Sequence, residues 1–171
     1  MSDGIVVDAN VIPDFYRELC VNNGCVYRTV IWLSEKCGIV ASDKVLIEWE
    51  NVCSAQVFIE WLADQLKAGG VRRIQCKKID RRIVKRMRVD CGFPCKDRDL
   101  EYIQCAHATA SERYIVTEDI DFYDPRAKGG EASIKRWARE ERCGQFCRFL
   151  LRRLGIKVGT ISHCREDFGI P

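Results

Sequence analysis

Short runs of consecutive apolar residues mark the candidate buried strands of the chain. Residues 5–7, 39–41 and 114–116 each form such a run, bounded by a glycine or a polar residue on either side. A continuous apolar run is typical of a parallel strand that is covered on both faces. Residues 71–79 instead alternate apolar and basic side chains, as a half-exposed edge strand does. With a last strand at residues 156–161, the pattern predicts five strands.

Helix-period apolar positions occupy most of the segments between these strands. The pattern predicts helices over residues 13–21, 26–37, 43–53, 55–68, 80–90 and 97–112, and one or two basic amphipathic helices within 131–154. Ser42 or Asp43 can cap the third helix, whereas Gly38 and Gly69-Gly70 end helices. Strands that alternate with helices predict an α/β fold, a three-layer sandwich whose mostly parallel sheet has helices on both faces.

Composition agrees with one ordinary globular domain. The 171 residues are 47% hydrophobic and 31% charged, enough to bury one core without disulfide or metal staples. The apolar runs are far shorter than the roughly 18 residues that a membrane-spanning helix needs. The N-terminal residues lack the charged and apolar regions of a signal peptide, so we expect a cytoplasmic protein.

The eleven cysteines are an odd number in a chain with no export signal, so we expect free thiols in a reducing compartment. Cys91 and Cys95, together with Cys143 and Cys147, offer two pairs that could jointly bind zinc. Their three-residue spacing is looser than the usual two-residue spacing. We therefore expect free thiols at these positions and no structural zinc.

Basic residues concentrate in one part of the chain, although the net charge is only +3. Between residues 72 and 88, nine lysines and arginines accompany a single acid, Asp80, and a second basic concentration covers residues 135–157. Such segregation suits a polyanionic partner, but a solvated helix face produces the same pattern. The candidate nucleic-acid-binding residues are Arg81, Arg82, Lys85 and Arg86.

Acidic residues stand at corresponding places in four separate segments. Asp8 and Asp119 follow predicted buried strands, Glu48 lies in the helix after the second strand, and Asp99 lies at the start of a later helix. Ligands of parallel sheets bind beyond the carboxyl ends of the strands. Four acids at one rim would repel one another unless cations neutralised them, and oxygen ligands favour Mg²⁺ or Mn²⁺.

Each of these acids also has an ordinary explanation. Asp8 is a common turn former, Glu48 could be an exposed helix residue, and Asp97 or Asp99 could be a helix N-cap. The two histidines, at positions 107 and 163, give little support to a histidine-based nuclease or a triad hydrolase.

The order and spacing of four sequence blocks resemble the PIN-domain ribonucleases. The first block is residues 5–12, Ile-Val-Val-Asp-Ala-Asn-Val-Ile, and the second is residues 42–48, with a serine six residues before a glutamate. The third is residues 99–108, from an aspartate to a run of small residues, and the fourth is residues 114–122, with the pattern Thr-x-Asp-x-Asp-Phe. The resemblance covers residues 4–123 and the last strand.

The resemblance implies a single PIN-like domain over residues 1–171, with a basic helical insertion at about 124–154. It implies that Asp8, Glu48, Asp99 and Asp119 are catalytic metal ligands for one or two Mg²⁺ or Mn²⁺ ions, with Asp121 as a further acid. Asn10 and Thr117 would position the loop. Asp97 competes with Asp99 for its role, and Glu50 competes with Glu48.

The function implied is endoribonuclease activity, a metal-dependent hydrolysis of phosphodiester bonds in single-stranded RNA. Similarity to free-standing prokaryotic PIN proteins adds the toxin of a toxin–antitoxin pair, with a small antitoxin protein as partner, no membrane association and a homodimer as one assembly. Two alternatives stay open. One is a catalytically idle RNA-binding or scaffold module, and the other is an unrelated α/β phospho-acceptor domain of the response-regulator kind.

Overall fold

The computed structural model describes residues 4–110, 112–127 and 132–171 and contains a five-stranded, all-parallel sheet. The strands are β1 (Ile5–Val7), β2 (Ile39–Ala41), β3 (Val71–Arg73), β4 (Tyr114–Val116) and β5 (Lys157–Gly159), in the spatial order β3-β2-β1-β4-β5. The predicted α/β class with a parallel sheet between helices is therefore confirmed.

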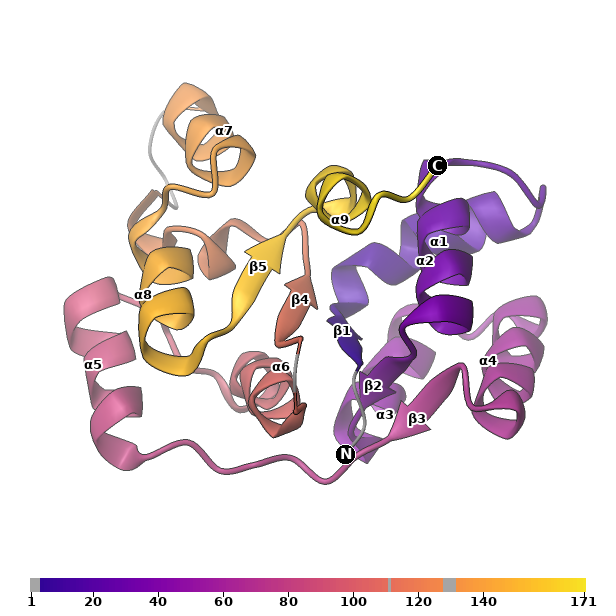
Figure 1. Ribbon diagram of the computed structural model, residues 1–171, viewed down its shortest axis with the longest axis horizontal. Coiled ribbons are helices and arrows are strands. Elements are labelled where there is room, and N and C mark those ends of the chain that lie inside the picture. Colours follow the sequence, from indigo (N-terminus) through magenta and orange to yellow (C-terminus); the bar gives the residue numbers. More distant parts are fainter. Residues whose placement is uncertain (1–3, 111, 128–131) are drawn as a thin grey trace.

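Helices cover both faces and both edges of the sheet (Figure 1). In the described part of the chain the α-helices are α1 (Ile12–Leu19), α2 (Cys25–Lys36), α3 (Asp43–Val52), α4 (Gln56–Ala68), α5 (Arg81–Cys91), α6 (Asp97–Ala108), α7 (Ala132–Glu140), α8 (Gln145–Leu154) and α9 (Ile161–Phe168). Helix α6 packs against β1, β2 and β4, while α2 and α9 contact each other on the opposite side of the strands. The sheet is thus the middle layer of a three-layer sandwich.

The three central strands, β1, β2 and β4, form the interior of the sandwich. Every residue of β1, β2 and β4 is buried, as a parallel strand between two helical layers requires. Val7 pairs with Val116, so β1 and β4 end side by side. The chain segments that follow these two strands therefore leave the sheet together, at its carboxyl edge.

The strand predicted over residues 71–79 is wrong in its length, because β3 ends at Arg73. β3 lies at the edge of the sheet and pairs only with β2, which itself ends at Ala41. The last hydrogen bond between them runs from Ile74 N to Ala41 O, at 3.0 Å. Residues 74–80 continue as a linker to α5, and Lys77 N donates to Gln104 O of α6 at 3.3 Å.

The C-terminal segment contains a helix that the sequence pattern did not predict. β5 stops at Gly159, and Thr160 caps α9 by accepting a hydrogen bond from His163 N. His163 Nδ1 accepts in return from Thr160 N at 3.2 Å, which completes a capping box. The predicted strand at 156–161 therefore ends two residues early, and His163 is a buried capping residue.

The basic segment at 131–154 forms two helices in its described part. Gly144 lies between them. A glycine is required there, because a Cβ atom would lie 2.1 Å from the carbonyl oxygen of Tyr123. Phe146 N donates to the same oxygen at 3.0 Å, which joins the start of α8 to the turn after β4. Residues 128–131, part of the predicted loop and insertion, lie outside the described residues.

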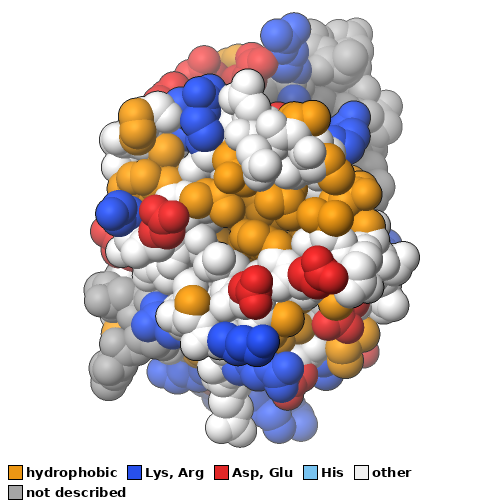
Figure 2. Space-filling view, turned by 90° about the vertical axis from the view of Figure 1, so that its right-hand side faces the viewer, with side chains coloured by type: hydrophobic (Ala, Val, Ile, Leu, Met, Phe, Trp, Pro, Cys, Tyr) orange, Lys and Arg blue, Asp and Glu red, His pale blue; other side chains and the backbone are white. Residues whose placement is uncertain are grey.

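One side of the molecule is rich in exposed hydrophobic side chains. Figure 2 shows them gathered on the side that carries α1, α2 and α4 in Figure 1. Val21 after α1, Val52 at the end of α3 and Val57 in α4 are exposed by 70%, 45% and 49%. Among the described residues, no helix is both long and apolar enough to cross a membrane.

Candidate functional site

Asp8 lies where β1 meets the helical turn η1 (Ala9–Val11), and it is only 7% exposed. Its carboxylate accepts a 2.6 Å hydrogen bond from Thr117 Oγ1. The pKa of Asp8 is raised to about 7, chiefly because burial removes water from the charged form. The bond from Thr117 opposes this rise, and the charges of Asp119 and Glu48 add to it. The fold therefore holds Asp8 where a negative charge is costly without a compensating cation.

Thr117 directly follows β4 and joins the two strand ends. Its hydroxyl donates to Asp8 and accepts from Asn10 Nδ2 at 3.1 Å and from Asp119 N at 3.0 Å. A hydroxyl has one proton and two lone pairs, so this geometry uses its full capacity. Asn10 Oδ1 also accepts from Glu118 N at 3.3 Å. These bonds hold the loop after β4 against the loop after β1, and the positioning role of Asn10 and Thr117 stays a prediction.

Glu48 projects from α3 and is linked to the segment after β1 by a phenol. Tyr102 OH donates to Glu48 Oε2 at 2.9 Å and accepts from Ala9 N at 3.2 Å. Burial and the nearby carboxylates raise the pKa of Tyr102, which keeps the phenol protonated as a donor. Trp49 Nε1 donates to Val7 O at 3.2 Å, which fixes α3 to the end of β1. The second predicted acid is therefore held near the first.

Asp99 approaches the same edge from the first turn of α6. Its pKa is raised, first because of burial, and the charges of Asp119 and Asp121 add to the rise while Arg98 and Lys96 oppose it. Asp119 caps the turn η2 (Ile120–Phe122), and its Oδ1 accepts from Asp121 N at 2.9 Å. The charge of Asp119 acts on both Asp8 and Asp99, so Asp119 lies near both of them.

The structure thus brings the five predicted acids to one edge of the sheet, from four separate segments. We refer to Asp8, Glu48, Asp99, Asp119 and Asp121 as the acid cluster. Among the described residues, no three of these acids have carboxylate oxygens that all lie within 4.8 Å of one another. Oxygens bound to one Mg²⁺ at about 2.0–2.1 Å lie within roughly 4.2 Å of one another. The donor chemistry fits Mg²⁺ or Mn²⁺, and joint coordination requires side-chain rotations that draw the carboxylates inward.

The competing acids have a different environment. Asp97 is exposed at the start of α6, and Glu50 is exposed on α3. The N-cap of α6 is Lys96, so the alternative in which Asp97 or Asp99 caps this helix is wrong. Asp99 is the better buried of the two aspartates, with a side chain 18% exposed.

The four predicted basic residues lie on α5, which packs against α8 beyond β5. They do not line a single surface. Arg81 and Lys85 line a groove of about 460 Å³ between α5 and α6, which they share with Lys78 and Arg88. Arg86 lines a second groove of about 450 Å³ between α5 and α8, and it pairs with Asp90 at 2.9 Å. Arg148, Arg152 and Arg153 line that second groove.

The C-terminal end of α5 connects this basic region to the acid cluster. Burial raises the pKa of Cys95, the Arg88 side chain opposes this rise, and the charge of Asp99 adds to it. Cys95 therefore lies close to both Arg88 and Asp99. Arg82 is exposed on α5 outside both grooves.

The cysteine pairs considered for zinc do not form a four-thiolate site in the described part of the chain. No ligand group that gathers within 4.8 Å contains Cys91, Cys95, Cys143 or Cys147. Cys147 Sγ instead contacts two carbonyl oxygens at 3.1 Å, in its own turn. All eleven cysteines are free thiols.

Two features of the structure were not identified from the sequence. Tyr102, which connects Glu48 to the chain beside Asp8, lies three residues after Asp99 and so shares its helix face. That spacing is a signal the sequence contained. Cys76, Glu101 and Cys105 form a separate cluster, of which the sequence shows only the one-turn spacing between Glu101 and Cys105.

Comparison with known proteins adds no assignment. No family model, no curated protein and no solved structure matches the chain.

Proposed function

We propose that the chain is a metal-dependent endoribonuclease of the PIN-domain type, which hydrolyses phosphodiester bonds in single-stranded RNA. The observation that carries this proposal is the gathering of five carboxylates around buried Asp8, whose pKa is raised to about 7. Carboxylates that repel one another, drawn from distant segments, are the arrangement that a divalent cation stabilises.

The side chains of the acid cluster have distinct parts in this proposal. Asp8, Glu48, Asp99 and Asp119 are the candidate ligands, with Asp121 beside Asp119. Bound Mg²⁺ or Mn²⁺ would supply an activated water and stabilise the leaving oxygen of the phosphodiester.

The hydrogen-bonded neighbours of the acids keep two of them in a fixed orientation. Thr117 directs one oxygen of Asp8 by donating to it, and Tyr102 does the same for Glu48. Each of these two donors bonds one carboxylate oxygen, Asp8 Oδ2 and Glu48 Oε2. A carboxylate has about four lone-pair positions, so these bonds leave room for a cation.

RNA is the proposed substrate because of the basic surface next to the acid cluster. The two grooves along α5 are lined by eight lysines and arginines from the linker, α5 and α8: Lys78, Arg81, Lys85 and Arg88 in the first groove, and Arg86, Arg148, Arg152 and Arg153 in the second. Such a surface attracts a phosphate backbone, and Arg88 approaches Asp99 through Cys95. A strand held along α5 would therefore reach the acids.

The toxin part of the proposal rests on the family resemblance alone. A small antitoxin partner, or a second copy of the chain, would need an accessible apolar surface, and the hydrophobic side of Figure 2 offers one. Co-purification with the product of the neighbouring gene tests this part. A complex that suppresses RNA cleavage would support it, and cleavage unaffected by that product would contradict it.

The experiment that tests the proposed activity is cleavage of a labelled single-stranded RNA with Mn²⁺, with Mg²⁺ and with a chelator. Wild type should cleave only with a metal, and Asp8→Asn should be inactive although folded. Asp97→Asn is the matched control on the exposed start of α6.

The same assay separates the alternatives. An idle RNA-binding module would bind the RNA and leave it intact with every metal. A phospho-acceptor domain would take up phosphate from a small acyl phosphate at Asp8. The only lysine of β5, Lys157, begins that strand and so lies at the amino edge of the sheet, opposite Asp8.

A further inference from the structure

Two cysteines and a glutamate that are distant in the sequence meet beside the linker after β3. Cys76 lies in this linker, whereas Glu101 and Cys105 lie one turn apart on the same face of α6. Cys105 is fully buried, Glu101 is 8% exposed and Cys76 is half-buried. We refer to these three residues as the sulfur cluster.

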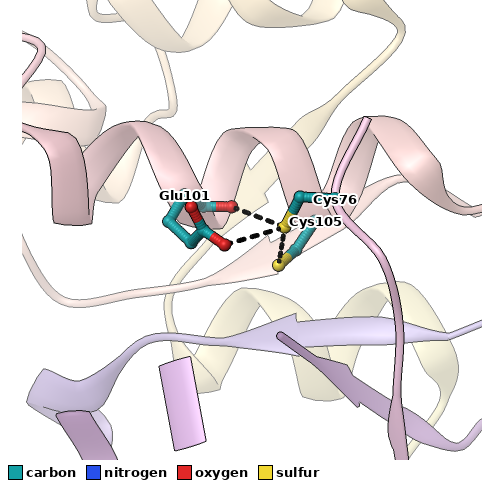
Figure 3. Close-up of side chains that lie close together, drawn as sticks. All are labelled: Cys76, Glu101 and Cys105. Carbon is teal, nitrogen blue, oxygen red and sulfur yellow. Dashed lines mark hydrogen bonds between the residues drawn. The ribbon is translucent and has the colours of Figure 1, made fainter. Parts of the chain in front are cut away.

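The three side chains point toward a common centre (Figure 3). Cys76 Sγ lies 3.2 Å from Glu101 Oε1 and 2.9 Å from Cys105 Sγ, and it also faces Glu101 O at 3.8 Å. One ligand atom from each residue lies within 4.8 Å of the other two. In the part of the chain that the structure describes, this is the one group of three or more histidine, cysteine or acidic residues with that property.

The surroundings of the sulfur cluster carry a compensating positive charge. Lys44 Nζ lies 3.5 Å from Glu101 Oε2, whereas Cys76 contacts the other oxygen, Oε1. Ser42, which follows β2, hydrogen-bonds with Glu101 and Cys105. A buried carboxylate is costly, and here it is directed at two thiols while a lysine holds its other oxygen.

We propose that the sulfur cluster is a binding site for one thiophilic divalent cation, Zn²⁺ in the cell. Two thiolate sulfurs and one carboxylate oxygen make a ligand set that selects zinc over Mg²⁺ or Ca²⁺. Binding forms two Zn–S bonds and one Zn–O bond and releases the two thiol protons to solvent. The three ligand charges and the cation sum to −1, which the Lys44 ammonium neutralises. Water fills the fourth position, on the half-buried side of Cys76.

Only small movements separate the observed geometry from a tetrahedral site. Zn–S bonds of about 2.3 Å place two sulfurs about 3.8 Å apart at the tetrahedral angle. Cys76 Sγ and Cys105 Sγ are 2.9 Å apart, in hydrogen-bond contact. Insertion of the cation would replace this bond and move the sulfurs apart by roughly 0.9 Å. Cys76 lies on a linker without regular secondary structure, which can make that movement.

The site would be structural and would act on the position of α5. It would fasten residues 74–80 to α6, to which the linker is already joined by the backbone hydrogen bond from Lys77 N to Gln104 O. That linker leads directly into α5. The sulfur cluster is separate from the acid cluster, because Asp99 and Tyr102 face the acid cluster from another side of α6.

Cobalt and zinc titrations of the reduced, metal-free protein test the site. Co²⁺ should give thiolate charge-transfer absorption and the visible bands of tetrahedral cobalt, saturating at about one equivalent, and Zn²⁺ should displace it. Mass spectrometry under native conditions should show one zinc per chain. Cys76→Ser and Cys105→Ser should lose the bands. Glu101→Gln should bind at least about 10-fold more weakly, since even residues behind metal ligands contribute roughly 10- to 100-fold to affinity.

Matched variants exclude general effects of losing a cysteine or an acid. Cys37→Ser replaces another half-buried thiol, and Cys164→Ser replaces another fully buried one. Both should keep the cobalt bands. Asp8→Asn should also keep them, which separates this site from the acid cluster.

Three outcomes would overturn the proposal. The first is a reduced wild-type protein that gives no thiolate-to-cobalt absorption. The second is cobalt absorption that stays unchanged in Cys76→Ser and Glu101→Gln. These two variants are sufficient for the test even if Cys105→Ser does not fold. The third is a reduced protein that takes up no zinc and is found only to form a Cys76–Cys105 disulfide with a peroxide as oxidant.

Discussion

Helix α6 presents two clusters of potential ligands, and they differ in donor chemistry and in spacing. One face holds Asp99 and Tyr102 toward the acid cluster, and another holds Glu101 and Cys105 toward the linker after β3. The acid cluster offers only oxygen atoms, and no three of its acids gather within 4.8 Å in the described residues. The sulfur cluster offers two sulfurs and an oxygen that do so.

The difference follows from charge. Ionised carboxylates repel one another, so metal-free acids stay apart. The charges of Asp119 and Glu48 add to the rise in the pKa of Asp8 that burial chiefly causes. Neutral thiols can hydrogen-bond to each other and to a carboxylate, so the sulfur cluster contracts without a cation. The distances between ligand atoms in the metal-free protein therefore do not show which cluster binds a cation more tightly. The donor atoms indicate which cation each cluster would select.

The largest expected effect is loss of RNA cleavage in the acid cluster alone. Asp8→Asn and Asp119→Asn should each lower the rate of Mn²⁺-dependent cleavage at least about 10³-fold, because each removes a ligand that acts with the others. Cys76→Ser leaves every acid of the acid cluster in place, so it should lower the cleavage rate far less than either of these two variants. Initial rates on a labelled RNA, with folding checked by circular dichroism, measure both. A Cys76→Ser variant as inactive as Asp8→Asn would show that the two clusters do not act independently.

The second effect is a pH-dependent stabilisation by Asp8→Asn in metal-free buffer. The pKa of Asp8 rises from 3.8 to about 7 on folding, so the folded state retains its proton longer than the unfolded chain. Wild type therefore loses stability as pH rises from about 4 to about 7, and the loss is complete above pH 7. At pH 8 the variant should be more stable by up to about 4 kcal/mol, at 1.36 kcal/mol per pKa unit.

Urea denaturation with a chelator present, at pH 4.5 and pH 8, measures this difference. The difference in the free energy of unfolding between variant and wild type should be small at pH 4.5 and should reach its full size by pH 8. Asp97→Asn should show no such gap, because Asp97 is exposed. An Asp8→Asn protein that is less stable than wild type at pH 8 would mean that Asp8 has a structural role instead.

The third effect is stabilisation by Mn²⁺, which should depend on only one of the clusters. A ligand that binds only the folded state stabilises it by about 2.7 kcal/mol at 100 times its Kd. Mn²⁺ should therefore raise the Tm of wild type and Cys76→Ser alike, and raise that of Asp8→Asn much less. Thermal shift at several Mn²⁺ concentrations measures this. Equal stabilisation of all three proteins would place the Mn²⁺ site outside the acid cluster.

The smallest effect concerns the salt dependence of RNA binding. If α5 contacts the RNA backbone, neutral replacements of Arg81, Arg82, Lys85 and Arg86 should flatten the slope of log K against log salt by about 0.7 per lost contact. Affinity should fall most at low salt. A filter-binding series with catalytically inactive Asp8→Asn as the background avoids cleavage of the probe.

A control of equal charge separates this effect from a change in net charge. It replaces four exposed basic residues of the helices on the other side of the molecule, Arg17, Arg28, Lys36 and Lys67. The control should change the slope little. A slope that falls equally in both variants would show that α5 has no special contact with RNA.

The sequence alone determined the three central strands and most of the helices that cover the sheet. Runs such as Ile39-Val40-Ala41 can be stable only between two apolar layers, so their burial and their parallel pairing follow from composition. Ser42 caps the start of α3 and Gly69 caps the end of α4, as the pattern predicted, because capping is a local interaction. Asp8 and Asp119 could be placed at one edge because parallel strands end together.

Only the tertiary structure decided where strands stop and which distant side chains meet. β3 is three residues long because its one partner, β2, ends, and no property of residues 74–79 reveals that. The hydroxyl of Tyr102 reaches Glu48, and Cys76 reaches Cys105, through packing of α6 against the sheet and the linker. Contacts of this kind depend on relative positions in three dimensions, which periodicity along a chain does not specify.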